Sequence, residues 1–283
     1  MDCFHDWCEA LADLGVMGLV PGPGSAGRTA PADRPAPREK AGVGQDPSPK
    51  PGPTRTARPA GSVGSAGKPA PAAAKAAQAW TPPADPAANP PQAAIDGCGC
   101  LADLRSLMSK CGACPLGAGR IKPVFGEGNP RARLMFVGEG PGRDEDIQGR
   151  PFVGRAGALL DKMIAALGMA RHDVYIANVV KCRPEDNRTP TSMESQTCLR
   201  SLRRQIELIS PAVLVGLGAT PLREMLGVTE GITKVRGKWH TASVAGREIP
   251  FMPTFHPAYV LRQYTEQVRR AVWDDLRSAA GRC

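Results

Sequence analysis

Four short apolar runs alternate with helical patterns from about residue 101 onward, and this alternation restricts the fold more strongly than any other feature. The runs cover residues 133–138, 174–180, 213–218 and 249–255. Each is almost wholly apolar, as expected for strands that are buried on both faces of a sheet. The fourth run contains Pro253, which has no backbone N–H to donate, so we predict that it is an edge strand or an irregular one.

Amphipathic helical patterns lie between and after these runs. They cover residues 156–167, 192–209, 220–226 and 257–280. In the third pattern we expect Thr220 to be the N-cap of its helix, because proline follows it. Strands alternating with helices indicate a mainly parallel sheet covered on both faces. We therefore predict an α/β fold of three layers, with a central, mainly parallel four-stranded sheet flanked by helices.

The first 95 residues differ in composition from the rest of the chain. Of the 75 residues from 21 to 95, 50 are Pro, Ala, Gly or Ser, which is too little apolar surface to offset the entropy of ordering. We predict that residues 21–95 are a disordered linker. Residues 1–20 have the spacing of a short amphipathic helix, which either docks on the folded part or frays, or else recruits a protein partner. Residues 96–283 are predicted to form one folded domain.

Positive charge is concentrated in that predicted domain. The whole chain has 36 Lys and Arg against 27 Asp and Glu, and residues 96–283 account for +8 of the net +9. Most of their basic residues are arginines, which make forked contacts with phosphate, and a basic domain is typical of nucleic-acid binding.

The sequence predicts neither a membrane-spanning helix nor a secretory signal. The apolar run at 212–219 is far shorter than the roughly 18 residues that span a bilayer. The acidic N-terminus lacks the positive start of a secretory signal. We therefore expect a cytoplasmic, monomeric protein with reduced thiols and no membrane partner.

The loop after the first apolar run is rich in glycine and in acids. Residues 138–157 read GEGPGRDEDIQGRPFVGRAG. Arg143 stands where a dinucleotide fingerprint needs its third glycine, and the lysine of a phosphate-binding Walker loop is absent. Ligands of parallel sheets bind beyond the carboxyl ends of the strands. Acids at such a strand end, in a basic domain, suggest catalysis. The four acids are Glu139, Asp144, Glu145 and Asp146.

Nine cysteines occur in the chain, and two sets of four have spacings that suit a metal site. One set is Cys98, Cys100, Cys111 and Cys114. The other is Cys111, Cys114, Cys182 and Cys198. Four thiolates suit either zinc or a [4Fe–4S] cluster, and the residues alone choose neither the set nor the metal.

The first motif, GEGPGRDEDIQGRPFVG, resembles that of the family 4 uracil-DNA glycosylases, the bacterial and archaeal class with an iron–sulfur cluster. The resemblance extends over about residues 101–280, with NVVKCRP at 178–184 and TFHPAYVLR at 254–262. It implies a uracil-DNA glycosylase-like fold and an enzyme of base excision repair. Such an enzyme flips uracil out of DNA and hydrolyses its N-glycosidic bond, leaving an abasic site. It also implies a [4Fe–4S] cluster held by Cys111, Cys114, Cys182 and Cys198.

The resemblance implies roles for the residues that meet uracil. Phe152 would stack on the base and the backbone at Gly140 would touch it. Asn178 would read the edge of the base, because an amide offers both donors and an acceptor. Glu145 would occupy the space that the methyl group of thymine needs and would thereby exclude normal DNA.

The resemblance likewise implies roles in catalysis and DNA binding. Glu139 would orient water and balance positive charge on the sugar, with Glu145 beside it in the pocket. His256 would stabilise the departing uracil anion. The His-Pro motif of the family is often completed by Ser, where this chain has Ala258. From their loop positions we expect four arginines to contact phosphates: Arg155, Arg183, Arg188 and Arg262.

Two other functions are compatible with the sequence. One is a catalytically inactive iron–sulfur module that binds DNA, against which the presence of Glu139, Asn178 and His256 argues. The other is a zinc-dependent nucleotide hydrolase, against which the Arg-rich composition argues. Some related glycosylases trap the abasic sugar through an inserted loop that contains histidine. Residues 181–194 have no such insertion, so we predict an enzyme that turns over on uracil-containing DNA.

Overall fold

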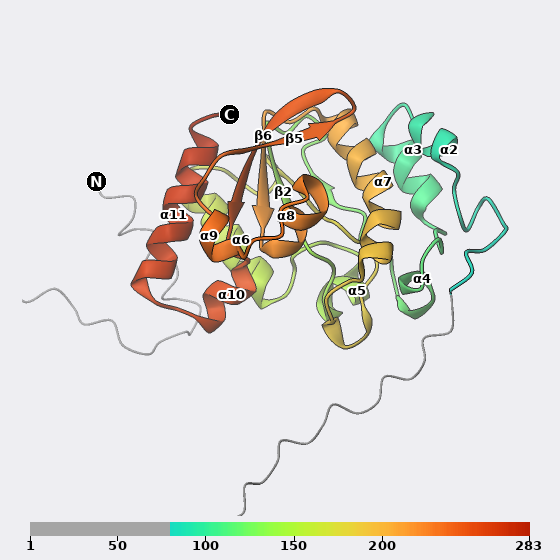
Figure 1. Cartoon of the computed structure of the whole chain (residues 1–283), viewed down its shortest axis with the longest axis horizontal. Helices are drawn as coiled ribbons and strands as arrows, with labels where there is room; N and C mark the ends of the chain where they lie inside the picture. Colours follow the sequence, from blue (N-terminus) through green and yellow to red (C-terminus); the bar gives the residue numbers. More distant parts are fainter. Residues whose placement is uncertain (1–79) are drawn as a thin grey trace, which may run out of the picture. The chain divides into compact units, whose positions relative to one another are not determined.

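The structure, a computed structural model, describes residues 80–283. The helix predicted at 1–20 and the predicted linker up to residue 79 lie outside the described residues. A six-stranded sheet runs through the middle of the described part, with the order β1-β3-β2-β4-β6-β5 (Figure 1). The strands are β1 (Glu127–Gly128), β2 (Leu134–Gly138), β3 (Tyr175–Asn178), β4 (Val213–Leu217), β5 (His240–Val244) and β6 (Arg247–Thr254).

The four predicted runs form the four parallel strands of this sheet, so the α/β class is confirmed. Neighbours pair in register, with Phe136 of β2 opposite both Ile176 of β3 and Val215 of β4. The sheet also has two short strands that we did not predict. β1 pairs antiparallel with β3, and β5 pairs antiparallel with β6.

The prediction that the fourth run is an edge strand is wrong, because β6 lies between β4 and β5. Pro253 comes after the last residue of β6 that pairs with β5, which is Phe251. The carbonyl of Pro253 accepts a hydrogen bond from the N–H of Gly237 at 3.1 Å. The nitrogen of Pro253 therefore points away from β4, so its lack of an N–H removes no hydrogen bond from the pairing of β6 with β4 or with β5.

Ten α-helices and one 3₁₀ helix accompany the sheet in residues 80–283. The α-helices are α2 (Gln92–Asp96), α3 (Leu101–Met108), α4 (Leu116–Gly119), α5 (Arg143–Gln148), α6 (Arg155–Ala166), α7 (Ser192–Ile209), α8 (Ala219–Leu226), α9 (Ile232–Val235), α10 (Pro257–Arg262) and α11 (Glu266–Ala280). The 3₁₀ helix is η1 (Glu185–Asn187). None of the helices in this part of the chain has both the length and the apolar composition that crossing a membrane requires.

One predicted domain boundary and two predicted helices differ from the structure. The boundary between residues 95 and 96 falls inside α2, whose Ile95 is buried. The pattern at 257–280 is two helices, because Gln263 leaves the helical conformation and Thr265 caps α11 by accepting from the N–H of Val268. Thr220 is not an N-cap, since α8 has Gly218 at that position and begins at Ala219.

The two faces of the sheet are covered by different helices, as a three-layer fold requires. On one face, side chains of β2, β3, β4 and β6 pack against α6, α10 and α11, with Phe136, Leu160 and Leu276 among the buried residues. On the other face, the alternate side chains of the same strands pack against α7. In Figure 1, α11 and α6 lie on one side of the strands and α7 on the other. Helices α2 and α3 form a smaller apolar cluster with Phe125.

Candidate active site

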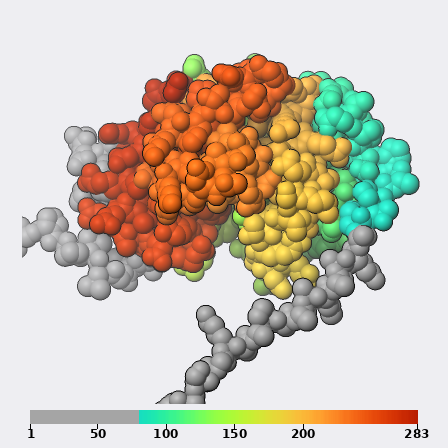
Figure 2. Space-filling view, viewed as in Figure 1, coloured from blue at the N-terminus to red at the C-terminus, as the bar shows by residue number. Residues whose placement is uncertain are grey.

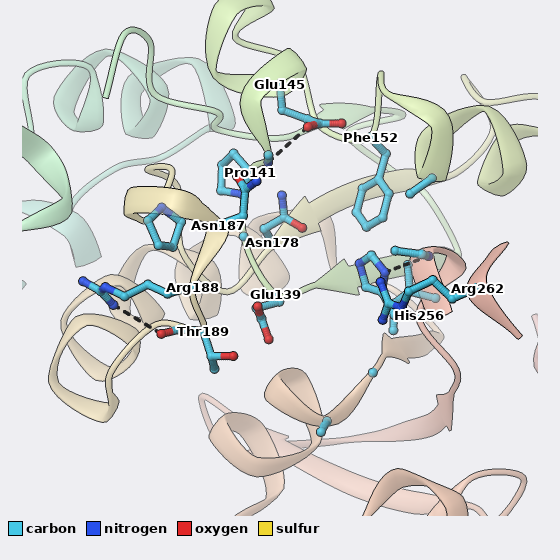
Figure 3. Close-up of a pocket in the computed structure, with 18 residues that line it drawn as sticks. Glu139, Pro141, Glu145, Phe152, Asn178, Asn187, Arg188, Thr189, His256 and Arg262 are labelled. Carbon is cyan, nitrogen blue, oxygen red and sulfur yellow. Dashed lines mark hydrogen bonds between the residues drawn. The ribbon is translucent and has the colours of Figure 1, made fainter. Parts of the chain in front are cut away.

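A cavity of about 560 Å³ lies at the carboxyl ends of the four parallel strands. The segments that line it follow β2, β3, β4 and β6, which are far apart in the sequence. In the space-filling view the surface is hollowed between the red segment of α10 and the yellow segment that leads into α7 (Figure 2). The close-up shows four predicted site residues around this space: Glu139, Phe152, Asn178 and His256 (Figure 3).

Gly138, the last residue of β2, allows a ring and an amide to meet at the floor of this cavity. It lies opposite Asn178 in the sheet register. A Cβ at position 138 would come within 2.4 Å of Asn178 Oδ1 and 2.6 Å of the Phe152 ring. Only glycine therefore leaves room for both side chains. The φ of Gly138 is not in the left-handed region, so the backbone conformation does not require a glycine here. The requirement comes from packing.

Asn178 carries a buried acceptor without a partner. The residue is 1% exposed, and its Oδ1 has no hydrogen-bond partner among the described residues. Leaving such an acceptor unpaired costs about 1–3 kcal/mol. A ligand that brings an N–H group into the cavity would satisfy this oxygen, so the site favours a ligand with a donor at this point.

Phe152 is held in a strained backbone conformation. Its φ is 51°, which non-glycine residues rarely adopt. Gly157 makes this turn possible, because a Cβ there would lie 1.9 Å from the carbonyl oxygen of Phe152. The Phe152 ring is buried and faces the ring of His256, with centroids 5.6 Å apart. Strain of this kind is often kept where a side chain must be aimed at a ligand.

Glu145 ties together the two loops on this side of the cavity. Its Oε2 accepts from the N–H of Gly142 at 3.0 Å. Its Oε1 accepts from the N–H groups of Val153 at 2.9 Å and Gly154 at 3.0 Å. The carboxylate is thus bound to main-chain donors, and it fixes the segment that follows Phe152. Its side chain also lines the cavity.

Glu139, the other acid of the predicted pair, accepts a hydrogen bond from Thr220, which we predicted to be a helix cap. The hydroxyl of Thr220 donates to Glu139 Oε2 at 2.5 Å. Thr220 is 2% exposed, in the first turn of α8. Because Gly218 takes the N-cap position, this hydroxyl is available to the carboxylate. A threonine at the carboxyl end of β4 was the sequence signal for this contact, and we interpreted it as a helix cap.

His256 is held in one orientation and one tautomer. It is the N-cap of α10, and its Nδ1 accepts from the N–H of Ala258 at 3.1 Å. A ring nitrogen that accepts a hydrogen bond carries no proton, so in the neutral imidazole the proton is on Nε2. Ala258 has no hydroxyl, but its main-chain N–H makes this bond.

Burial, and to a smaller extent the nearby Arg262, lowers the pKa of His256 to about 4, while Glu145 acts in the opposite direction. We therefore expect the imidazole to be neutral at pH 7 and to gain its proton only when the pH falls to about 4. The ring ¹⁵N shifts of His256 in an NMR titration measure this midpoint. Replacing Arg262 with Gln should move the midpoint to higher pH, because a nearby positive charge is removed.

The matched control is Arg155→Gln, since Arg155 lies in the same site region but is not among the charges that act on His256. It should leave the midpoint unchanged. A midpoint near the ordinary value of 6.5 in the unmodified protein would contradict the prediction.

The four arginines expected to contact phosphates differ in their surroundings. Arg188 binds both oxygens of Glu194, at 2.7 and 2.8 Å, and so anchors η1 to the start of α7. Arg183 donates to the side chain of Asn187 at 2.8 Å. Within residues 80–283, Arg155 and Arg262 form no ion pair or hydrogen bond through their side chains, and both are exposed. Of the four, Arg188 and Arg262 line the cavity.

Asn187 is a lining residue that the sequence analysis missed. Its φ is 55°, and that of the preceding Asp186 is 52°, so two consecutive residues adopt the left-handed conformation. Asparagine and aspartate tolerate this conformation better than other non-glycine residues. The Asp-Asn pair after a strand was the signal, but it indicates a turn and says nothing of a cavity.

The cysteines Cys111, Cys114, Cys182 and Cys198 line a second, small cavity of about 20 Å³, between the segments that follow α3 and β3 and the first half of α7. Cys98 and Cys100 do not line it. Cys98 donates to the carbonyl of Ala94, and Cys100 caps α3. All cysteines of the described part are free thiols. No three His, Cys, Asp or Glu side chains in residues 80–283 form a ready group for a metal ion.

Two positively charged residues belong to this cysteine cavity. Arg120 donates to the Sγ of Cys182 at 3.2 Å, and Lys181 lines the cavity. Burial raises the pKa of Cys114 and of Cys182 to about 12, and the neighbouring Cys198 adds to the rise. A metal that binds these thiols would therefore displace their protons.

Comparison with known proteins identifies a family for this chain. The family model described as the uracil DNA glycosylase superfamily matches residues 125–277. A type-4 uracil-DNA glycosylase from Thermotoga maritima is 50% identical over 176 residues, which are 61% of this chain and 88% of the relative. The type-4 enzyme from Archaeoglobus fulgidus is 41% identical over 184 residues, or 64% and 91% of the two chains. A type-5 uracil-DNA glycosylase from Pyrobaculum aerophilum is 32% identical over 155 residues, or 50% and 66%.

Proposed function

This chain belongs to the uracil DNA glycosylase superfamily, and we propose that it hydrolyses the bond between uracil and deoxyribose in DNA. The product is an abasic site, which enters base excision repair. The observation that carries this proposal is the unpaired, buried Oδ1 of Asn178, which lies beside the Phe152 ring in the cavity. A flipped base would supply both an aromatic face and an N–H group at this place.

Recognition of uracil follows from the chemistry of its edge. Uracil has a protonated ring nitrogen next to a carbonyl, and an amide matches this pair with one acceptor and one donor. Cytosine presents the reverse pattern, an acceptor nitrogen beside an amino donor, so it would match Asn178 only if the amide turned over. Phe152 would stack on the base. Gly140 lines the cavity without a side chain, so its main chain can approach the base.

Exclusion of thymine is proposed to depend on Glu145. Its three hydrogen bonds to main-chain N–H groups hold the wall that the methyl group of thymine would meet. A rigid wall discriminates better than a mobile one, because it does not yield to the larger base. Glu145 would then act on specificity, and Glu139 on the reaction itself.

For the chemical step we propose that Glu139 and His256 act on opposite charges. The bond from the base to C1′ breaks and its electron pair stays on uracil. A water oxygen bonds to C1′, and Glu139 orients this water, balances the positive charge on the sugar and accepts a proton. The Nε2–H of neutral His256 would donate to the departing uracil oxygen, as the donors of an oxyanion hole do.

DNA binding is proposed to rely chiefly on the exposed arginines that have no partner in the described part. These are Arg155 and Arg262, whose guanidinium groups are available for phosphates. Arg183 and Arg188 already bind Asn187 and Glu194, so we assign them to holding the loop after β3.

For the cysteine cavity we propose a [4Fe–4S] cluster held by Cys111, Cys114, Cys182 and Cys198. Four free thiols on one cavity, with a guanidinium donating to one of them, are a donor set that suits such a cluster. When bound, the cluster would hold together the segment after α3, the segment after β3 and helix α7. Iron and zinc analysis of the purified protein separates this proposal from zinc.

The test of function is a fluorescent oligonucleotide with a single uracil. We expect incubation with the protein, followed by alkali, to cut the strand at that position. Oligonucleotides with thymine or cytosine at the same position are the controls and should stay intact. An inactive DNA-binding module would shift the oligonucleotide in a gel without creating an alkali-labile site, and this result would overturn the proposal. So would hydrolysis of free nucleotides alone.

A further inference from the structure

Lys181 is a buried cation that the proposed reaction does not use. The residue is 4% exposed. Its Nζ donates to the main-chain carbonyl of Asn178 at 2.8 Å and to Gln205 Oε1 at 2.6 Å. No carboxylate of residues 80–283 pairs with it. A buried ammonium group without a negative partner is unfavourable, so its counter-charge must come from elsewhere.

The cysteine cavity is where that counter-charge would arise. Lys181 lines this cavity and precedes Cys182 in the chain. Its main-chain N–H donates to the Sγ of Cys198 at 3.3 Å. Thiolates that bind a metal are negatively charged, and hydrogen bonds from outside the ligand set orient them. One residue therefore contacts a proposed cluster ligand through its main chain and presents a positive charge beside the set.

The other end of Lys181 reaches the base-reading residue. Asn178 is the last residue of β3, with its side chain at the large cavity and its main-chain carbonyl bound to the Lys181 ammonium. Gln205 of α7, which is fully buried, holds the same ammonium and also donates to the carbonyl of Phe125 at 2.8 Å. The ammonium thus has one position, between β3 and α7. Losing it would leave the carbonyl of Asn178 without this donor.

We propose that Lys181 is a positioning residue that couples the cysteine cavity to the uracil-reading amide of Asn178. The inference rests on the proposed function and on a cluster in the cavity. It assigns the cluster a purpose in this chain, which is to keep the end of β3 in the position that reads the base. His256 follows β6 and lies outside this connection, whereas Glu139 meets it through the main chain only, where its carbonyl accepts from the N–H of Val180 at 3.1 Å.

The test is Lys181→Met, which keeps the length of the side chain but removes its charge and its donors. We expect two linked changes: an affinity for iron that is lower by about 10–100-fold, the usual effect of removing a group that supports metal ligands, seen as faster loss of iron to a chelator, and weaker binding of free uracil. For the oligonucleotide, KM should rise more than kcat falls. The control is Lys234→Met, an exposed lysine of α9, which should behave as the unmodified chain.

The two readouts must change together for the inference to hold. Loss of iron with unchanged uracil binding would overturn it, and so would weaker uracil binding with unchanged iron. A wild-type-like Lys181→Met variant would overturn this inference alone, whereas an unmodified chain that fails to release uracil would overturn the proposed function as well. If Lys181→Met does not fold, Gln205→Leu removes one of the two acceptors of the ammonium and should produce both changes in smaller measure.

Discussion

Replacing Glu139 with Gln is expected to lower the rate of uracil release by about 10²–10⁴-fold, the usual contribution of a general base. Glutamine has the shape of glutamate and can still accept the hydrogen bond from Thr220. Glutamine carries no negative charge and accepts no proton from water. The fall in rate therefore measures the effect of the charge separately from that of the side-chain shape. Single-turnover kinetics on a uracil oligonucleotide measure the rate, and a gel shift should show nearly unchanged DNA binding.

The matched control is Asp144→Asn in the same acidic loop. Asp144 is exposed and does not line the cavity, so this change removes the same charge without touching the site. It should leave the rate close to that of the unmodified chain. Equal losses in the two variants would mean that the loop acts through its overall charge, and would contradict the role assigned to Glu139.

Gly138→Ala is expected to lower kcat/KM by about 10²-fold, the scale of an ångström-sized misplacement in an active site. The added methyl group would overlap Asn178 Oδ1 and the Phe152 ring. Both atoms belong to side-chain ends, so these side chains would move while the strand stays in place. The alanine variant should therefore fold and lose most of its activity.

Gly216→Ala is the control for strain in the sheet. Gly216 lies in β4, beside β2, and a methyl group there would overlap the Phe251 ring at 2.3 Å. It does not line the cavity. Both variants should lower the free energy of unfolding by about 1–3 kcal/mol, as overpacking does. Only Gly138→Ala should lose activity beyond that effect, and similar activities in the two would contradict the prediction.

The strands could be predicted where the chain is apolar on both faces and not elsewhere. Residues 213–217 are buried throughout in β4, and their apolar sequence indicates this burial. β1 has two residues, and β5 alternates buried and exposed positions at the margin of the sheet, so neither has that signal. The misplaced edge strand has the same origin. Pro253 excludes a hydrogen bond on one side only, and the sequence does not indicate which side.

The site could be predicted as far as strand ends determine it. Glu139, Asn178 and His256 come together because parallel strands bring their carboxyl ends to one edge of the sheet. The partners of side chains depend on tertiary position, and the sequence analysis missed them. It made Thr220 a cap, where the fold joins it to Glu139, and it did not predict that Arg188 binds Glu194.

The two candidate sets of metal ligands also could not be distinguished from the sequence. Spacing alone allowed Cys98 and Cys100 as well as Cys182 and Cys198. The fold separates these pairs, because Cys98 and Cys100 lie just before α3, whereas Cys182 follows β3 and Cys198 lies in α7. Local spacing can indicate a chelating pair, but which other cysteines lie on the same cavity depends on how the helices and strands pack.

The bond from Ala258 to His256 has a consequence for how this protein can vary in evolution. The ring is oriented by a main-chain group, which every amino acid except proline has. Position 258 can therefore exchange its side chain among lineages without losing the tautomer that the reaction needs. A side-chain hydroxyl at position 258 is therefore not needed to hold the His256 ring in this orientation.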